Sequence, residues 1–287
     1  MKSLLGIAPQ REPDGSYRPS KVALRLSTSK TTDFITPDYD RYQGPRSKIL
    51  VIATERKNMT MTNGKEFSTG NHPVEALVPM LHLRDAGFDL EIATPTGAPA
   101  VFEMWAFPSE DDNVNGIFEQ FSADFANPRS LADFVATSLE NPERYAAVFV
   151  PGGHGAMLGI PDDPNVGTVL RWAHEHGLHT ISLCHGPGAF LATALDGQDF
   201  LYDGYEMAVF PDSVDRQTPK IGYLPGQMPW ALSEKLADIG ATVINKKADD
   251  TVCLDRRLIT GASPQASNQL GQLAAKTLLD HAKVSGQ

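Results

Sequence analysis

The sequence has few cysteines, and they are not clustered. Cys184 and Cys253 are the only two. Neither belongs to a CxxC pair or to a group of histidines and cysteines with the spacing of a zinc site. This excludes thioredoxin-like chemistry and cysteine-based zinc sites. We expect two free thiols, as is usual in a reducing compartment.

Long apolar runs and clusters of positive charge are also absent. No stretch approaches the ~18 to 20 consecutive apolar residues of a transmembrane helix, and the N-terminal "MKSLLGIAPQREPDG" has too short an apolar run for a signal peptide. The net charge of -10 and the pI near 5.2, without any Lys/Arg-rich run, disfavour binding to phosphate backbones and anionic membranes. We expect a cytoplasmic protein without a membrane or nucleic-acid role.

The chain does contain enough apolar residues for a large core, since 41% of its 287 residues are hydrophobic. From Lys48 onward, short apolar runs alternate with helical periodicity, which predicts an α/β fold with a mostly parallel sheet covered by helices on both faces. The predicted strands are 48–54, 88–94, 145–152, 178–184, 205–210, 241–245 and 257–260. The predicted helices are 72–87 and about 164–176, 187–196, 228–239 and 264–282.

Two segments interrupt this pattern. Residues 1–46 are polar and rich in Ser, Thr and Pro, and we expect an extended arm that either stays mobile or packs over the body. Residues 96–144 are too long for a loop and contain aromatic clusters, which indicates an inserted subdomain. We expect these two segments to form a small second domain beside an α/β core of residues 47–95 and 145–287.

The stretch "TISLCHGPGAF" places Cys184 and His185 where a predicted strand gives way to a helix. The Gly and Pro that follow allow a sharp turn, as in the elbow that exposes a nucleophile above a parallel sheet. A thiol at a helix N-terminus is expected to be stabilised as thiolate. The alternative is a buried structural cysteine, which this context makes the weaker interpretation.

A glycine-rich loop, "VFVPGGHGAM", follows another predicted buried strand. If that strand neighbours the strand of Cys184, the N–H groups of Gly153 and His185 converge on one oxygen and form an oxyanion hole. A plain turn is the alternative for this loop.

Acid–base partners have to come from elsewhere in the chain. Asp212 in "VFPDSVD" follows a predicted strand, at the edge where sites gather in open α/β sheets, and the nearby Asp215 competes for the same role. Either aspartate could instead cap a helix. Glu75 lies in the first turn of a predicted helix, where it is either a desolvated proton carrier or an ordinary solvated first-turn glutamate.

Together, "FSTGNHPVE", "VFVPGGHGA", "SLCHGP" and "FPD" resemble the ThiJ/PfpI superfamily, and within it the branch of large heat-shock chaperones also described as glyoxalase III and protein deglycase. The resemblance runs from about Lys48 to the C-terminus. It implies a flavodoxin-like sheet, a small second domain and a homodimer. It also assigns the catalytic roles to Cys184, His185, Asp212 and Glu75, and the oxyanion hole to the amides of Gly153 and His185.

The branch also has a His, Glu, His metal site, and this chain departs from it. The matching positions are Arg84, Asp89 and Phe121. We therefore expect no metal at that site, although His72 or His82 could be recruited to another arrangement. No cofactor is expected either, because the cysteine thiol would take the place of glutathione in the reaction that the resemblance implies.

The resemblance implies glutathione-independent conversion of methylglyoxal to lactate through a cysteine hemithioacetal, with Glu75 moving a proton between the two carbons. The expected partners are methylglyoxal, glyoxal, and glycated or unfolded proteins. Three alternatives stay open: a deglycase acting on glycated side chains, a stress-inducible holdase chaperone using exposed apolar surface, and a cysteine-dependent amidase or peptidase.

Overall fold

A seven-stranded sheet forms the centre of the molecule. The computed structural model describes residues 5–284. The sheet order is β12-β13-β9-β8-β3-β6-β7, and all neighbours are parallel except β12 and β13. Its strands are β3 (Lys48–Ile52), β6 (Asp89–Thr94), β7 (Arg129–Ser130), β8 (Tyr145–Val150), β9 (His179–Leu183), β12 (Val252–Asp255) and β13 (Leu258–Gly261).

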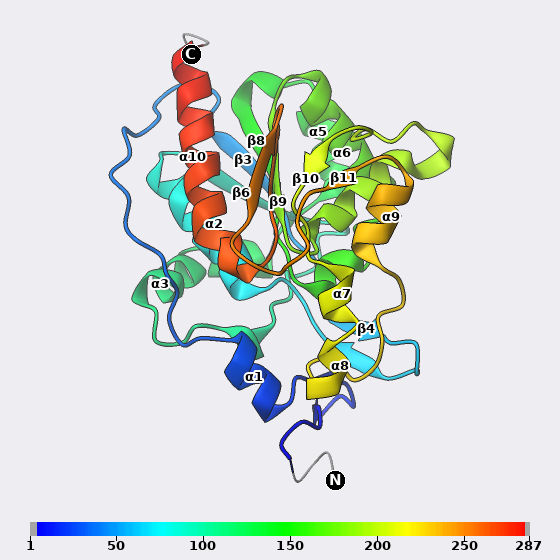
Figure 1. Ribbon diagram of the computed structural model, residues 1–287. Coiled ribbons are helices and arrows are strands. Elements are labelled where there is room, and N and C mark those ends of the chain that lie inside the picture. Colours follow the sequence, from blue (N-terminus) through cyan, green and yellow to red (C-terminus); the bar gives the residue numbers. More distant parts are fainter. Residues whose placement is uncertain (1–4, 285–287) are drawn as a thin grey trace.

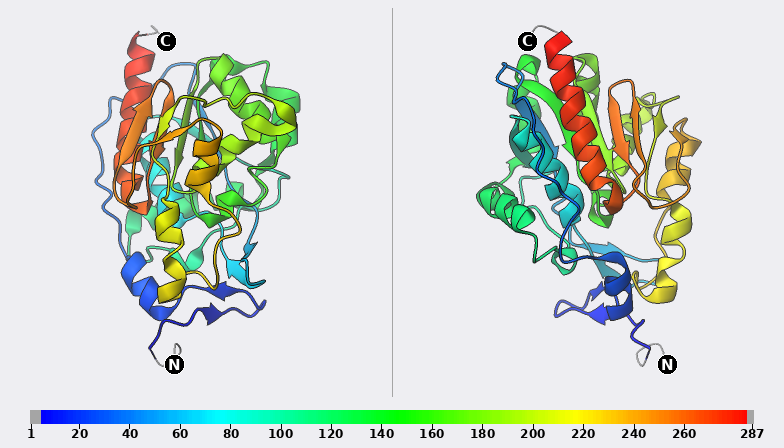
Figure 2. Two further views of the ribbon diagram at one scale, coloured as in Figure 1. Left: turned by 45° about the vertical axis from the view of Figure 1, so that its right-hand side comes forward. Right: turned by 60° about the vertical axis from the view of Figure 1, so that its left-hand side comes forward.

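Helices cover both faces of this sheet (Figures 1 and 2), as the alternating sequence pattern predicted. One apolar cluster joins one sheet face to α2, α3, α4 and α10, and a second cluster joins the other face to α5, α6 and α9. These helices are α2 (Pro73–Asp85), α3 (Asp112–Gln120), α4 (Ser122–Ala126), α5 (Leu131–Ser138), α6 (Pro164–Glu175), α9 (Leu232–Asp238) and α10 (Ser267–Val284). The inner strands are near-continuous apolar runs because both of their faces are buried.

Some local predictions differ from the structure. The predicted helix 187–196 is a 3₁₀ helix, η4 (Gly186–Gly197), interrupted at Leu195 and Asp196. The predicted strands near 205–210 and 241–245 shorten to β10 (Glu206–Met207) and β11 (Thr242–Val243), which pair with each other outside the main sheet. The antiparallel strand β12 was not predicted, because its residues "VCLD" are too few to show a period.

The N-terminal arm packs on the body of the molecule. Its strands β1 (Gln10–Arg11) and β2 (Tyr17–Arg18) form a second sheet with β5 (Glu66–Ser68) and β4 (Asn58–Thr60), in the order β1-β2-β5-β4. Helix α1 (Lys21–Ser27) follows, and its N-cap Ser20 also donates a 2.7 Å hydrogen bond to Ile221 O at the end of α8 (Thr218–Ile221). The arm is therefore hydrogen-bonded to the body.

The inserted segment is spread over the main sheet. Its strand β7 extends the sheet beside β6, α5 packs against α6, and α3 packs against α2. Thr32 of the arm donates to Asp111 at the start of α3, which links the arm to the insertion. The division into two domains stays a prediction.

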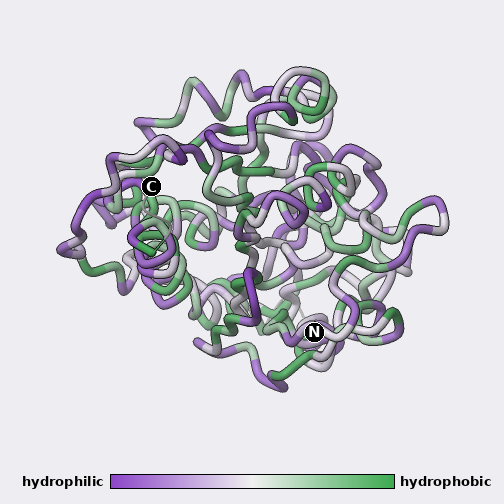
Figure 3. The backbone as a smooth tube through the Cα atoms, turned by 90° about the horizontal axis from the view of Figure 1, so that it is seen from above, coloured by the Kyte–Doolittle hydropathy of each residue, from purple (hydrophilic) through white to green (hydrophobic). Residues whose placement is uncertain are grey.

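The C-terminal helix α10 buries one face against α2 and leaves the other polar. In Figure 3 it is seen end-on beside the C-terminus, with green and purple segments alternating along it. Neither α10 nor any other helix within residues 5–284 combines the length and apolar character needed to cross a membrane. Four short elements complete the description: η1 (Met104–Ala106), η2 (Pro142–Arg144), η3 (His154–Met157) and η5 (Pro264–Ala266).

Candidate active site

Cys184 follows directly on the last residue of β9 and has a strained backbone. Its φ of 59° lies in the left-handed region, which non-glycine residues rarely adopt. The Cys184 N–H donates to Gly261 O at 2.8 Å, and its C=O accepts from Phe210 N at 2.9 Å, so neighbouring segments hold the turn in place. The predicted strand–turn–helix geometry around the cysteine is present.

The Cys184 thiol lies beside the imidazole that follows it in the chain. The Sγ atom is 3.3 Å from His185 Nδ1, so these adjacent residues do face each other. The other ring nitrogen, Nε2, is 2.8 Å from Asp215 Oδ2. Phe210 stacks on the imidazole with the ring centres 4.7 Å apart. The ring is therefore held between a thiol and a carboxylate, the arrangement that suits a base.

Asp215 is the carboxylate at this position, whereas the family resemblance assigned the role to Asp212 and the residues alone left Asp215 as a competitor. Both lie on α7 (Asp212–Asp215), a single helical turn. The Asp212 oxygens instead accept from Ser233 N at 3.0 Å and Glu234 N at 2.9 Å, in the first turn of α9. Asp212 thus caps a helix, which was the alternative left open for it.

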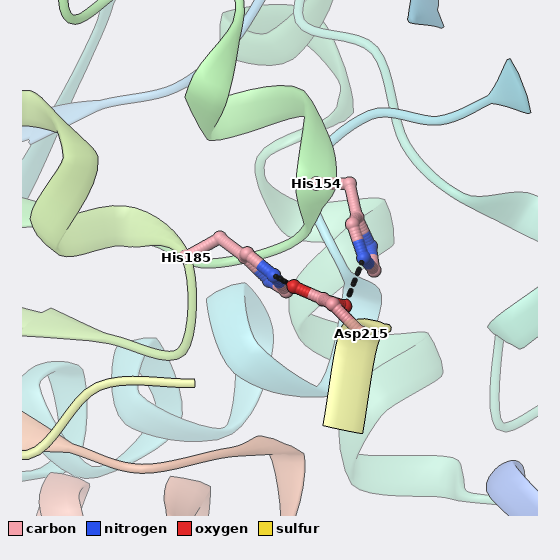
Figure 4. A group of neighbouring side chains, drawn as sticks. All are labelled: His154, His185 and Asp215. Carbon is pink, nitrogen blue, oxygen red and sulfur yellow. Dashed lines mark hydrogen bonds and ion pairs between the residues drawn. The ribbon is translucent and has the colours of Figure 1, made fainter. Parts of the chain in front are cut away.

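Asp215 is shared by two imidazoles, as Figure 4 shows. His154 Nε2, from η3, lies 3.1 Å from Asp215 Oδ1, and the His154 and His185 rings have centres 4.0 Å apart. Burial alone would raise the pKa of Asp215, but the two imidazoles outweigh it and hold this pKa well below its usual value. We call Cys184, His185, Asp215 and His154 the thiol wall.

The ligand atoms of His154, His185 and Asp215 lie within 4.8 Å of one another. This is close enough for a divalent cation, but both Asp215 oxygens are already engaged by the imidazoles.

Gly153 and its neighbour Gly152 follow β8, which pairs with β9 as the oxyanion-hole prediction required. The N–H groups of Gly153 and His185 donate to no backbone carbonyl among the described residues. Gly153 has a φ of 102°, and a Cβ on Gly152 would collide with the Glu75 carboxyl and lie 2.8 Å from Cys184 Cβ. Glycine is thus required at both positions, by conformation at one and by space at the other.

Glu75 is desolvated. Of its two interpretations, the structure therefore favours a buried carboxyl over a solvated first-turn glutamate. Its residue is 1% exposed, and neither carboxyl oxygen makes a hydrogen bond within residues 5–284. Burial raises the pKa of Glu75 well above its usual value, and the carboxylate of Glu103 raises it further, whereas the Cys184 thiol and the Gly153 N–H act in the opposite direction.

Burial also raises the pKa of the Cys184 thiol well above its usual value, and the neighbouring Glu75 carboxylate adds to this effect. Burial therefore favours the neutral thiol, and the expectation that the helix N-terminus stabilises Cys184 as a thiolate is wrong. The effect of Glu75 on Cys184 is not mutual, because the hydrogen bond of the Cys184 thiol lowers the pKa of Glu75, but burial favours the neutral form of both groups.

Two further groups lie beside Glu75, and the sequence did not assign them to catalysis. His72 precedes α2, its Nδ1 atom has no partner, and burial together with the nearby imidazoles lowers its pKa to about 3. Glu103, from the insertion, is 1% exposed, and burial raises its pKa to about 7. We call His72, Glu75 and Glu103 the acid wall. The signal for Glu103 was a lone carboxylate inside the apolar run "VFEMWAF".

One cavity of about 270 Å³ joins the two walls. Tyr223 also lines it, and Leu26 and Ser27 of the N-terminal arm lie at its rim. At ~30 Å³ for each water, this is room for about nine waters, and thus for a molecule well above the size of a three-carbon dicarbonyl.

The three positions matched to the metal site have other contacts. Arg84 pairs with Asp85 at 2.7 Å, Asp89 accepts from Ser47 at 3.0 Å, and Phe121 is buried in an apolar cluster. The absence of metal there stays a prediction.

The remaining candidate side chains are structural. His82 is hydrogen-bonded to Tyr39 Oη at 2.9 Å and to Asn268 Oδ1 at 2.8 Å, and it does not line the cavity. Cys253 lies in β12 and, like Cys184, is a free thiol.

Comparison with known proteins identifies close relatives. Protein/nucleic acid deglycase HchA of Escherichia coli (strain K12 / DH10B) is 46% identical over 266 residues, covering 93% of this chain and 93% of that protein. The structure of glyoxalase III from Candida albicans superimposes with a TM-score of 0.62 at 23% identity, over 82% of this chain and 97% of that one. A ThiJ/PfpI domain protein from Brachyspira murdochii gives 0.50 at 10% identity, over 83% and 99%. No protein-family model matches the chain.

Proposed function

Because this chain belongs to the HchA deglycase family within the ThiJ/PfpI superfamily, we propose that it is a glutathione-independent, cysteine-dependent enzyme that converts methylglyoxal to lactate. The family predicted from the sequence motifs is thereby confirmed. The observation that carries the proposed reaction is a thiol lying between an imidazole nitrogen at 3.3 Å and a buried, unpartnered carboxyl.

The first step is addition of the thiol to the aldehyde. Cys184 gives its proton to His185 Nδ1, and the sulfur forms a bond to the aldehyde carbon, C1. The N–H groups of Gly153 and His185, which donate to no backbone carbonyl among the described residues, stabilise the resulting oxyanion. Glu75, protonated because of its raised pKa, then gives its proton to that oxygen and becomes a carboxylate.

The second step moves a hydrogen between carbons. The Glu75 carboxylate takes the proton from C1 of the hemithioacetal and returns it to C2, while the hydroxyl proton on the C1 oxygen moves to the C2 oxygen. This leaves a thioester of lactate on Cys184. Water then hydrolyses the thioester, Glu75 takes a proton from that water, and His185 returns its own proton to the departing sulfur. The thiol replaces glutathione, so the scheme uses no cofactor.

The test is lactate formation from methylglyoxal without glutathione, measured for wild type, Cys184→Ala and Glu75→Gln. We expect Cys184→Ala to abolish turnover and Glu75→Gln to reduce kcat by about 10² to 10⁴-fold. Cys253→Ala is the matched control, because that thiol lies outside the cavity. Equal activity in all of these proteins would refute the catalytic role of Cys184.

Deglycation is the second candidate, favoured by the name of the E. coli relative and by a cavity larger than methylglyoxal needs. In this reaction the thiol attacks the carbon of a glycated side chain and the amine or thiol leaves. Adduct loss should be followed while a scavenger removes free dicarbonyl. If the adduct is lost no faster than it is released spontaneously, the enzyme is not a deglycase and only the glyoxalase activity stands.

The same variants and substrates distinguish two other classes of function from the glyoxalase. A holdase chaperone would suppress aggregation equally well with Cys184→Ala, and an amidase or peptidase would cleave a peptide panel and leave methylglyoxal unconsumed. The homodimer that the family implies is a further proposal, which analytical ultracentrifugation tests.

A further inference from the structure

Unsatisfied polar atoms gather on one side of the cavity. Among residues 5–284, seven buried side-chain polar atoms make no hydrogen bond, and four of the seven belong to His72, Glu75 and Glu103. A buried polar atom without a partner costs about 1 to 3 kcal/mol, so such clustering is not expected of a purely structural region. The acid wall therefore has more hydrogen-bonding capacity than Glu75 alone needs for one proton transfer.

Glu103 is held firmly, with one oxygen free. Thr69 Oγ1 donates to Glu103 Oε1 at 2.6 Å, whereas Glu103 Oε2 has no partner. The backbone N–H of Glu103 donates to Asn71 O at 3.0 Å, and Asn71 lies just before the helix that carries Glu75. The insertion and the start of α2 thus bring the two carboxyls to one wall.

Glu103 is also suited to proton exchange near neutral pH. The titratable groups facing it are His154 from η3, Glu75 from α2 and Tyr223. Burial raises the pKa of Glu103 to about 7, although His154 acts against this. By contrast, the pKa of His72 falls to about 3 and that of Tyr223 lies well above its usual value, both mainly because of burial. Of His72, Tyr223 and Glu103, the last is the one with a pKa near neutral pH, so it can both give and take a proton there.

We propose that Glu103 is a second acid–base residue of this site: during the isomerisation it exchanges protons with the two substrate oxygens, while Glu75 exchanges them with the two carbons. This inference rests on the proposed isomerisation of the hemithioacetal.

The proton balance closes over the two carboxyls. When the Glu75 carboxylate takes the C1 proton, the Glu103 carboxyl gives its proton to the C2 oxygen, and an enediol forms. Glu75 then returns its proton to C2, and the Glu103 carboxylate takes the proton from the C1 hydroxyl, which becomes the thioester carbonyl. Each glutamate ends the isomerisation in the form in which it entered.

The test is Glu103→Gln, which keeps the side-chain shape and the acceptor for Thr69. We expect kcat to fall by about 10²-fold or more, with the rate of Cys184 alkylation by iodoacetamide unchanged. In wild type, kcat should decline as pH rises through about 7, because Glu103 must start protonated. That decline should be missing in the variant. Glu103→Asp should restore it in part.

Glu66→Gln is the matched control. Glu66 also accepts from a threonine hydroxyl, Thr60 Oγ1 at 2.7 Å, but it lies outside the cavity. Thr69→Val provides a second variant that leaves Glu103 in place. Because the Thr69 hydroxyl lowers the pKa of Glu103, its removal should shift the kcat decline to higher pH.

Three results would overturn the inference: turnover of Glu103→Gln within twofold of wild type, reduced turnover with the decline near pH 7 preserved, or an unshifted decline in Thr69→Val. Failure of the proposed function is distinguishable, because wild type itself would then form no lactate.

Discussion

The thiol wall and the acid wall face one cavity, but their polar groups are satisfied to different degrees. On the thiol wall, His185 and His154 are each bonded to an Asp215 oxygen, and His185 also contacts the thiol. On the acid wall, four polar atoms lack partners. The hydrogen bonds of the thiol wall fix the positions of its side chains before the substrate binds. The unpartnered atoms of the acid wall stay available for hydrogen bonds to the substrate.

The pKa shifts differ in the same way. Asp215 is held charged by its imidazoles, whereas burial favours the neutral forms of Glu75 and Glu103. Their surroundings thus keep Asp215 ionised and favour the protonated forms of Glu75 and Glu103 in the same cavity. Such separation is typical of sites that use one carboxyl to orient a base and others to move protons.

Removing the shared carboxylate should have the largest effect. Asp215→Asn replaces one of the two acceptors with an amide N–H, so at least one imidazole loses its partner and His185 is no longer held in the form that accepts the thiol proton. We expect kcat/KM for methylglyoxal to fall by about 10² to 10⁴-fold. An effect below threefold would mean that the thiol wall is not organised around Asp215.

Closing the space between the walls should have the next largest effect. In Gly152→Ala the new Cβ would lie 2.6 Å from Leu183 O and 2.8 Å from Cys184 Cβ, and it would also collide with Glu75. Displacing a reacting group by about 1 Å can cost about 10²-fold in rate, which is the loss expected in kcat.

Gly116→Ala is the control for that substitution. Gly116 lies within α3, and its added Cβ would meet nothing within 4 Å, so activity should not change. Wild-type activity in Gly152→Ala would show that the walls need not approach as closely as they do here.

Replacing the titratable carboxyl of Glu103 should change the pH dependence of stability with a definite sign. The pKa of Glu103 rises from 4.5 to about 7 on folding, so its favourable contribution is complete below pH 4.5 and is lost as pH rises towards 7. Glu103→Gln does not titrate. Its free energy of unfolding should therefore improve relative to wild type by up to about 3 kcal/mol across this window, at 1.36 kcal/mol per pKa unit. Urea titrations at several pH values measure the difference, and a constant difference would contradict the assignment.

The smallest catalytic effect should come from Asp212, at the edge of the thiol wall. Asp212→Asn weakens the cap of α9 and should lower the free energy of unfolding by about 1 kcal/mol, with kcat/KM within twofold of wild type. Thermal unfolding and turnover are both measured. A loss of activity as large as that of Asp215→Asn would return the catalytic role to Asp212.

Asp212 and Asp215 also show how far motif spacing can be used. Their position after a strand-forming run predicted a carboxylate at this edge of the sheet, and one is there. They lie three residues apart on one short turn, so the sequence could not tell which side chain turns towards His185. That choice depends on α9, whose first-turn N–H groups bind Asp212.

The sequence alone determined the α/β sandwich, the elbow at Cys184, the glycine loop and the family. Each depends on local periodicity, turn chemistry or a contiguous motif, and neighbouring residues suffice to show them. The acid wall was decided only by the tertiary structure, because Glu75 and Glu103 meet through the pairing of an insertion with the start of α2. The pKa directions were decided there too. Burial outweighs the helix terminus expected to charge Cys184, and burial depends on every segment that closes the cavity.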